Sequence, residues 1–158
     1  MKAGAHKHLA QFNIGRLRYP IQDVRNKDFC GGAEIVNRIA AQSPGSVWKY
    51  ETAPGGAVLE VIDEDPMIVV NMTVWERIED LRHFVWNKLH KRFYQRRAQW
   101  FSVILGSHSV MWWVAPGHRP SVVEGYERLA CPRADGSPDE AFDWGHTGCG
   151  GSREMQCA

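Results

Sequence analysis

The stretch MIVVNMTVWERIEDLRHFVWNKLHKR, residues 67–92, decides the fold because a strand pattern gives way to a helical one within it. Its opening part is apolar except for Asn71 and Thr73, which alternate with apolar neighbours and so give the strand one polar side. Acidic residues then precede basic ones, an order that favours one long helix over residues 76–99. Buried polar groups cost free energy unless they are paired, so Asn71 and Thr73 indicate a binding pocket.

The rest of the chain repeats these two patterns. Strand-like alternation recurs at residues 8–17, 46–52, 57–62 and 110–115, where 57–62 is expected to form a hairpin with 46–52. Helical spacing recurs at residues 23–42 and 120–129. Gly31 and Gly32 predict a bend in the first of these helices. The order βαββαβ predicts an α+β fold of the ferredoxin-like type, in which the first and third main strands are neighbours.

Length and composition indicate one folded domain. The chain has 158 residues, of which 44% are hydrophobic, enough for a proper core. We assign residues 1–132 to the ferredoxin-like domain and residues 133–158, rich in glycine and polar residues, to a surface-wrapping or flexible tail. The tail contains Cys149 and Cys157, to which the sequence assigns no role.

Charge and hydropathy exclude several classes of partner. Nineteen basic and eighteen acidic residues leave a net charge of +1, so we expect no nucleic-acid partner. The longest apolar run, residues 67–70, is far shorter than the roughly 20 residues of a membrane span. The first residues lack the apolar core of a signal peptide, so we expect a cytoplasmic protein without a membrane partner. Phosphate-binding loops, nucleophile elbows and zinc-binding helices are missing from the sequence.

The polar sides of two strands define the candidate pocket. The first strand contributes Gln11 and Asn13, and the third contributes Asn71, Thr73 and Trp75. Because these strands are expected to be neighbours, their polar side chains should gather on one face, a pattern typical of a small-molecule site. Its aromatic walls are expected to be Trp48 and one of Trp112 or Trp113, with Trp112 preferred. The alternative is that neighbouring side chains simply satisfy the polar groups.

The predicted long helix adds candidates for proton transfer. At about 100° per residue, His90, Tyr94 and Arg97 share one side of the helix and point away from its buried stripe. An imidazole that titrates near neutrality suits a proton acceptor, so His90 is the candidate base. The alternative is a partly exposed surface histidine. A ferredoxin-like sheet has helices on one face only, so the apolar other face predicts a homodimer.

The segments HLAQFNIGRLRYP, IVNRIAAQSPGSVW, IVVNMTVWERIEDLRHFV, MWWVAPGHRPSVVEGYERL and SPDEAFDW resemble, in this order, a bacterial family known only as a domain of unknown function, DUF3291. The resemblance covers residues 8–144, and GHRPSVVE is its most specific string. It implies the dimeric α+β barrel superfamily, in which two ferredoxin-like protomers each hold a pocket between sheet and helices. Members include antibiotic-biosynthesis and haem-degrading monooxygenases, aldoxime dehydratases and lactone isomerases.

The resemblance also assigns residues. Asn13 falls where haem-degrading relatives keep an asparagine. Their pocket tryptophan falls at Phe84, and their haem-ligating histidine falls near Tyr94, four residues beyond His90. The resemblance therefore implies either no cofactor or a haem bound through His90 or Tyr94.

The leading hypothesis is an oxidative enzyme that tailors an aromatic or polyketide-like metabolite. Asn13 and Asn71 would bind a substrate oxygen, and His90, with Tyr94, would accept a proton. The predicted substrate site is completed by Arg97, which balances a substrate anion, and by the ring-clamping residues Trp48, Phe84 and Trp112. Two alternatives stay open: a cofactor-free isomerase, dehydratase or cyclase, and a non-catalytic ligand-binding dimer.

Overall fold

The computed structural model describes residues 6–50, 65–104, 108–130 and 141. The strands are β1 (His8–Leu17), β2 (Ser46–Lys49), β3 (Ile68–Trp75), β4 (Phe101–Ser102) and β5 (Ser109–Val114). The helices are η1 (Val24–Asn26), α1 (Lys27–Gln42), α2 (Ile78–Val85), α3 (Lys88–Gln95), η2 (Arg97–Gln99) and α4 (Val122–Ala130). The hairpin strand predicted at residues 57–62 and nearly all of the predicted tail lie outside the described residues.

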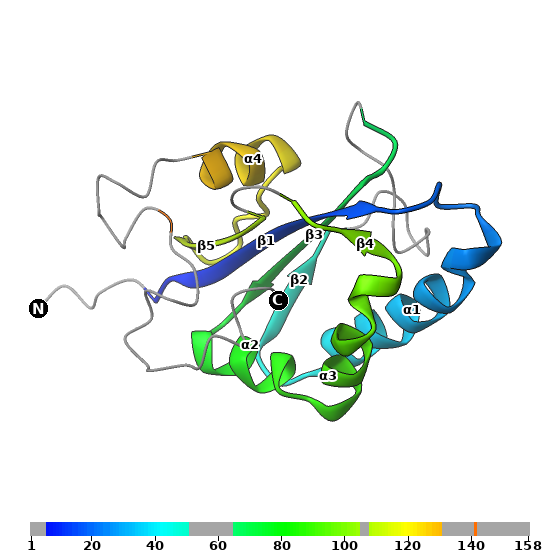
Figure 1. Ribbon diagram of the computed structural model, residues 1–158. Coiled ribbons are helices and arrows are strands. Elements are labelled where there is room, and N and C mark those ends of the chain that lie inside the picture. The colour runs from blue at the N-terminus through cyan, green and yellow to red at the C-terminus, as the bar shows by residue number, and fades with distance from the viewer. Residues whose placement is uncertain (1–5, 51–64, 105–107, 131–140, 142–158) are drawn as a thin grey trace, which may run out of the picture.

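The sheet is antiparallel and has β1 at its centre (Figure 1). On one side β1 pairs with β3, so that Asn13 lies opposite Asn71, and β2 extends the sheet beyond β3. On its other side β1 pairs with β5 and, at its end, with the short β4. The predicted neighbours β1 and β3 are therefore confirmed, and the order is that of a ferredoxin-like fold.

Helices cover both faces of the sheet (Figure 1). Helices α1, α2 and α3 lie on the face that carries Leu9, where Leu81 of α2 joins the core. Helix α4 lies on the opposite face, where Tyr126 meets Phe12 edge to face with ring centroids 5.3 Å apart. The expectation of helices on one face only is therefore wrong, because α4 buries part of the second face. Dimerisation stays a prediction.

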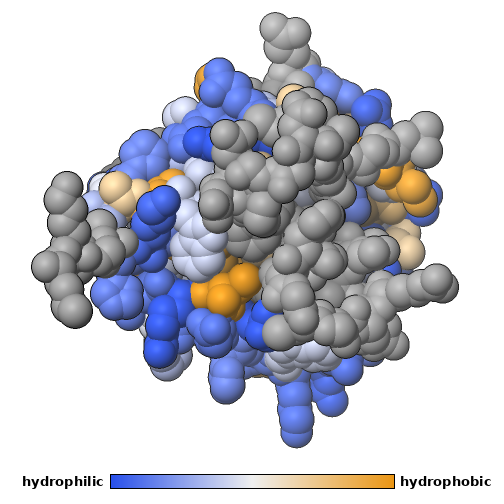
Figure 2. Space-filling view, turned by 90° about the vertical axis from the view of Figure 1, so that its left-hand side faces the viewer, coloured by the Kyte–Doolittle hydropathy of each residue, from blue (hydrophilic) through white to orange (hydrophobic). Residues whose placement is uncertain are grey.

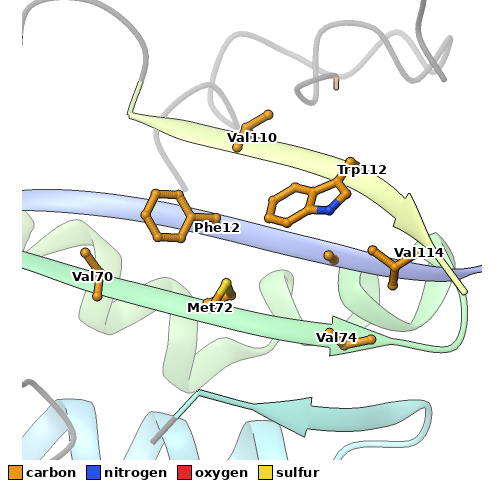
Figure 3. Packing of buried hydrophobic residues seen from close by; sticks show 8 residues of the cluster. Phe12, Val70, Met72, Val74, Val110, Trp112 and Val114 are labelled. Carbon is orange, nitrogen blue, oxygen red and sulfur yellow. The ribbon is translucent and has the colours of Figure 1, made fainter. Parts of the chain in front are cut away.

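The core under α4 consists of apolar side chains that β1, β3 and β5 direct to the same side (Figure 3). Its buried members are Ala10, Phe12, Val70, Met72, Val74, Val110, Trp112 and Val114. All of them are even-numbered, and each is separated by one residue from the next on its strand, as the period of two requires.

Residues 117–124, the string GHRPSVVE, form hydrogen bonds that hold the start of α4 against this core. Ser121 Oγ accepts a hydrogen bond of 3.1 Å from the backbone N–H of Glu124, in the manner of an N-terminal helix cap. The carboxylate of Glu124 accepts from Trp112 Nε1 at 3.1 Å and lies 2.8 Å from His118 Nε2. One glutamate thus links the helix start, the preceding loop and strand β5.

A glycine pair tests how closely α4 packs. A Cβ added to Gly125 would lie 2.5 Å from the Phe12 ring, whereas a Cβ on Gly31 of α1 would meet nothing within 4 Å. We expect Gly31→Ala to raise the free energy of unfolding by up to about 1 kcal/mol, the usual gain in an open helix. Gly125→Ala should instead lower it by about 1 to 3 kcal/mol through overpacking. Urea denaturation measures both, and equal effects of the two substitutions would contradict the packing of α4 on Phe12.

The predicted long helix is wrong. It is broken into α2 and α3, and η2 follows them. The break occurs because Asn87 adopts a non-helical backbone conformation (φ −58°, ψ 137°) and its side-chain oxygen accepts from the Leu89 N–H at 2.9 Å, which starts a new helix. The predicted bend in α1 is also wrong, since α1 runs unbroken through Gly31 and Gly32. Gly32 instead makes room for Phe93 of α3, whose ring a Cβ there would approach to 2.5 Å.

The described surface is mixed. Figure 2 shows one face whose coloured residues are mainly hydrophilic, with apolar patches that are separate from one another. Large exposed apolar side chains include Trp86 and Leu89 at the corner between α2 and α3. No helix within the described ranges is long and apolar enough to cross a membrane.

Candidate functional site

Two facing amides form the centre of the candidate site. Asn13 of β1 and Asn71 of β3 are directly opposite each other, which places their Cα atoms about 4.5 to 5.5 Å apart. Both are half-buried on the face covered by α1, α2 and α3. Within the described residues neither side chain forms a hydrogen bond, so both amides are available to a ligand.

The next pair along the strands, Gln11 and Thr73, is buried and its side chains are hydrogen-bonded to each other. Gln11 and Thr73 are 7% and 6% exposed. The Thr73 hydroxyl donates to Gln11 Oε1 at 3.1 Å and accepts from Trp75 Nε1 at 2.9 Å. For Thr73 the alternative of mutual satisfaction therefore holds, and its direct role in ligand binding stays a prediction. Thr73 and Gln11 hold the Trp75 indole in place.

These four residues, Gln11, Asn13, Asn71 and Thr73, form a polar strip that separates two apolar clusters. Along each strand the strip lies between members of different clusters. One cluster consists of Leu9, Ala40, Trp75, Leu81 and Met111. The other consists of Leu17, Phe29, Ala33, Val69 and Trp100. A strip of amides with apolar material on both sides is suited to a ligand that is mostly apolar and carries a few oxygen atoms.

A line of rings connects the polar strip to α3. Trp75 stacks on Phe84 with centroids 5.4 Å apart and an interplanar angle of 24°. Phe84 in turn contacts His90, with centroids 5.0 Å apart. The structure therefore joins the predicted residues Thr73, Trp75, Phe84 and His90 in one continuous series of contacts.

His90 is held as a neutral base. Its Nδ1 lies 3.1 Å from the backbone carbonyl oxygen of Val85, and a carbonyl only accepts, so Nδ1 carries the proton. The neutral ring then presents the lone pair of Nε2, which has no partner among the described residues. Burial lowers the pKa of His90, and the hydrogen bond to Val85 opposes this in part. The imidazole is therefore set up to take a proton at Nε2.

Arg97 does not belong to the site, although the sequence placed it there. It is exposed, its guanidinium lies 3.8 Å from the centroid of the Tyr94 ring, and it donates to the Tyr94 carbonyl at 3.1 Å. The prediction assumed one straight helix, and the breaks before α3 and η2 invalidate that geometry. Tyr94 is half-buried one turn beyond His90 on α3, and its role stays a prediction.

Trp48 and Trp112 are also misplaced by the sequence prediction. Both pack in the cluster under α4, on the face opposite the polar strip. Trp112 is paired with Ala10 and Trp48 with Val74, and paired residues point to the same side of a sheet. The neighbouring Trp113 is the tryptophan of β5 that joins the cluster of Trp75.

The sequence reading missed two polar groups beside the strip. Ser109 is buried and lies opposite Asn13 on the other side of β1. Asn37 is half-buried on α1, one turn from both Ala33 and Ala40, which are buried in the two flanking clusters. Its spacing from these alanines was the available signal, since it puts Asn37 on the side of α1 that faces the sheet.

A haem does not fit between the rings described above. The Nε2 of His90 has the chemistry of an axial ligand, with Nδ1 held by a carbonyl as is usual for such histidines. However, the Trp75, Phe84 and His90 rings are in contact and leave no slot for a macrocycle between them. Among the described residues there is also no group of three or more His, Cys, Asp or Glu side chains that could hold a metal ion.

Comparisons confirm the resemblance and the fold. The family model described as domain of unknown function DUF3291 matches residues 8–155. A conserved protein from Methanosarcina mazei Go1 has a TM-score of 0.51 at 8% identity, over 70% of this chain and 94% of that one. A candidate antibiotic biosynthesis monooxygenase from Nitrosomonas europaea has 0.51 at 8% identity, over 77% and 100%.

Rv0793 from Mycobacterium tuberculosis has a TM-score of 0.50 at 10% identity, over 72% of this chain and 99% of that one. Among curated proteins none matches the chain. At such identities the likeness establishes a shared ferredoxin-like fold and no more.

Proposed function

The chain belongs to the family described as domain of unknown function DUF3291, and we propose that it is a small-molecule enzyme of the monooxygenase type that oxidises an aromatic, enolisable metabolite. The observation that carries this proposal is the pair of unpartnered amides, Asn13 and Asn71, half-buried between two apolar clusters. A core strand has no packing reason to carry such groups, whereas a substrate oxygen gives them partners.

The spacing of the strip suits a flat, fused-ring substrate. Successive residues on one face of a strand are about 7 Å apart, and the Trp75 indole leans back along β3 to Thr73. A carbonyl oxygen bound at Asn13 and Asn71 leaves the substrate rings to extend past the buried Gln11–Thr73 pair toward the half-buried Phe84 and His90, with Trp75 supporting Phe84 from beneath. In this arrangement the oxygen-binding amides and the base serve opposite ends of one molecule.

The proposed reaction begins with loss of a proton from a CH₂ group that is conjugated with the carbonyl through the ring and lies at the end of the substrate remote from the amides. His90 Nε2 takes this proton, and the amides stabilise the oxyanion of the resulting enolate. The enolate is electron-rich and is oxidised by dioxygen, the second substrate. One CH₂ group and one O₂ yield one C=O group and one water, so that one oxygen atom enters the product and the other leaves as water.

Two further observations favour this chemistry as the first to be tested. The fold is shared with a candidate antibiotic biosynthesis monooxygenase, although at 8% identity. The neutral, tautomer-fixed His90 supplies the base that an enolisable substrate needs. The proposed steps use this chain's own groups and dioxygen, and none of them passes through a haem.

Oxygen uptake with an enolisable polycycle such as anthrone tests the proposal. We expect uptake that depends on the protein, with the product ketone identified by mass spectrometry after incubation in ¹⁸O₂. Conversion of such a substrate under strict anaerobiosis would overturn the monooxygenase in favour of an isomerase, dehydratase or cyclase. Binding of polycycles without conversion would leave a ligand-binding protein.

The pH dependence of His90 gives a separate prediction. Because burial lowers its pKa below the ordinary value of 6.5, the unfolded chain takes up this proton at a higher pH than the folded chain. The free energy of unfolding should therefore fall as pH drops below about 6.5 and should gain nothing from this group above it. Activity should fall over the same acidic range, since protonated Nε2 accepts no proton.

His90→Gln should remove both the acidic loss of stability and the proton-transfer step, lowering kcat by about 10² or more. The matched control is His83→Gln, because His83 is an exposed histidine of α2. Urea denaturation and kcat measured from pH 5 to pH 8 decide the matter. Identical pH profiles for the His90 variant and the unmodified protein would exclude His90 as the base.

A further inference from the structure

Lys49 lies on the same face of the sheet as the polar strip. Trp48 of β2 and Tyr50, which follows the strand, pack in the cluster under α4. Lys49 lies between them in the chain and is paired with Thr73, so its side chain points to the other face. It is half-buried there, at the edge of the sheet next to β3.

Lys49 is the one ionisable side chain that the described strands place on this face. The other positions, read from the pairing register, are uncharged: Leu9, Gln11, Asn13, Gly15, Leu17, Ser46, Val69, Asn71, Thr73, Trp75, Phe101, Ser109, Met111 and Trp113. An ammonium group beside a row of amides in a largely apolar setting has a strong electrostatic effect, because water screens it poorly. A negative charge that forms on the strip therefore has one cation on the sheet to meet.

We propose that Lys49 binds the oxyanion of the substrate, and that the substrate class is a phenol or enol bound as its conjugate base. This inference rests on the proposed function and adds the cation that the exposed Arg97 does not supply. Asn71 is the diagonal neighbour of Lys49 across β2 and β3, about 7 Å away between Cα atoms, within reach of a long side chain. One oxygen thus contacts both the Lys49 ammonium and the Asn71 amide.

The proton balance follows directly. The phenol or enol O–H breaks, its proton leaves to water, and the electron pair stays on the oxygen beside Lys49. Charge is conserved, because the oxyanion and a hydrated proton form together, and His90, at the other end of the substrate, takes no part in this proton release. Lys49 makes an interaction within the fold already, and its three N–H donors allow the oxyanion to share the ammonium with that partner.

A chromogenic phenol measures this effect without any turnover. With 4-nitrophenol as the probe, the absorbance of the bound phenolate against pH gives the pKa of the bound molecule. We expect the protein to lower that pKa by about 1 to 3, as a cation within a few ångströms does. Lys49→Met should abolish the shift and weaken binding of the phenolate by roughly tenfold or more. Lys49→Arg should keep much of the pKa shift, because arginine keeps the positive charge.

Lys88→Met is the matched control, because Lys88 is an exposed lysine of α3, and it should leave the shift unchanged. A pKa shift of the same size in the Lys49→Met protein would overturn the role of Lys49, and so would failure of the probe to bind. The outcome of the oxygen-uptake assay is independent of the outcome of this phenol assay. A lowered phenol pKa that depends on Lys49, without oxygen uptake, would support the oxyanion site and refute the monooxygenase, whereas uptake unaffected by Lys49→Met would do the reverse.

Discussion

Replacing both Asn13 and Asn71 by alanine should lower kcat/KM for an enolisable polycycle by at least about 10²-fold. Removal of a single donor to a developing oxyanion costs about 10² to 10³ in rate in well-studied enzymes. The two amides have no partner within the described residues, so their loss breaks no internal hydrogen bond. The free energy of unfolding should therefore change by less than about 1 kcal/mol.

The comparison of rate with stability makes this experiment specific. Steady-state oxygen uptake gives kcat/KM, and urea denaturation of the same preparations gives the free energy of unfolding. Gln95→Ala removes an exposed carboxamide from α3 and serves as the control, with both quantities expected to stay unchanged. If the double variant keeps full activity, the polar strip is not the substrate site. If it unfolds instead, the amides are structural.

Trp75→Ala should cause the largest loss of stability, about 3 to 5 kcal/mol. Trp75 is fully buried, its ring stacks on Phe84, and its indole N–H donates to the Thr73 hydroxyl. Alanine at this position removes the ring contacts, leaves a cavity at the start of α2 and takes away one partner of a buried hydroxyl. Chemical denaturation should show the loss as a lower midpoint with an unchanged slope.

Two variants divide this loss into parts. Trp75→Phe keeps a ring but removes the N–H. Its free energy of unfolding should therefore lie between those of the Trp75→Ala variant and the unmodified protein. Trp86→Ala removes a tryptophan whose side chain is 45% exposed and should cost about 1 kcal/mol or less. Similar losses for Trp75→Ala and Trp86→Ala would contradict the burial of Trp75 and its place in the line of rings.

Most strands of this fold were predictable from the alternation of their side chains, whereas the two-residue strand β4 was not predicted. Residues 8–17 were predicted as a strand and form β1 over the same residues. The polar positions Gln11 and Asn13 matched those of β3 in parity, so the expected pairing of the two strands brought them together. An error of one residue in register would have put every polar group on the wrong face, and none occurred.

The helical candidates were less predictable for a physical reason. Charge order and apolar spacing continue across the break between α2 and α3, so a local pattern there resembles one long helix. The signal that ends it is Asn87, which favours the start of a helix over its interior. Once the axis breaks, angles computed along a single helix no longer relate Arg97 to His90.

The alternation of side chains along β2 and β5 is enough to place Trp48 and Trp112 on the correct face of the sheet. The rule that placed Gln11 also applies to β2 and β5, where it assigns Trp48 to the face of Tyr50 and Trp112 to the face of Val110. The same rule assigns Lys49 to the polar strip. By contrast, the hydrogen bond that fixes the tautomer of His90 depends on a helix break and has no signature in the sequence.

The hydrogen bond between His90 and Val85 spans the junction of two helices, and this links motion to proton affinity. Loss of the carbonyl bond alone would lower the pKa of His90, whereas contact with water would raise it, and burial is the larger of the two influences. A separation of α3 from α2 would therefore favour the charged imidazolium, and the packed junction favours the neutral ring with Nδ1 bound to Val85. Because the Asn87 side chain starts α3 at this junction, a substitution there would change the proton affinity of His90 without any contact with the substrate.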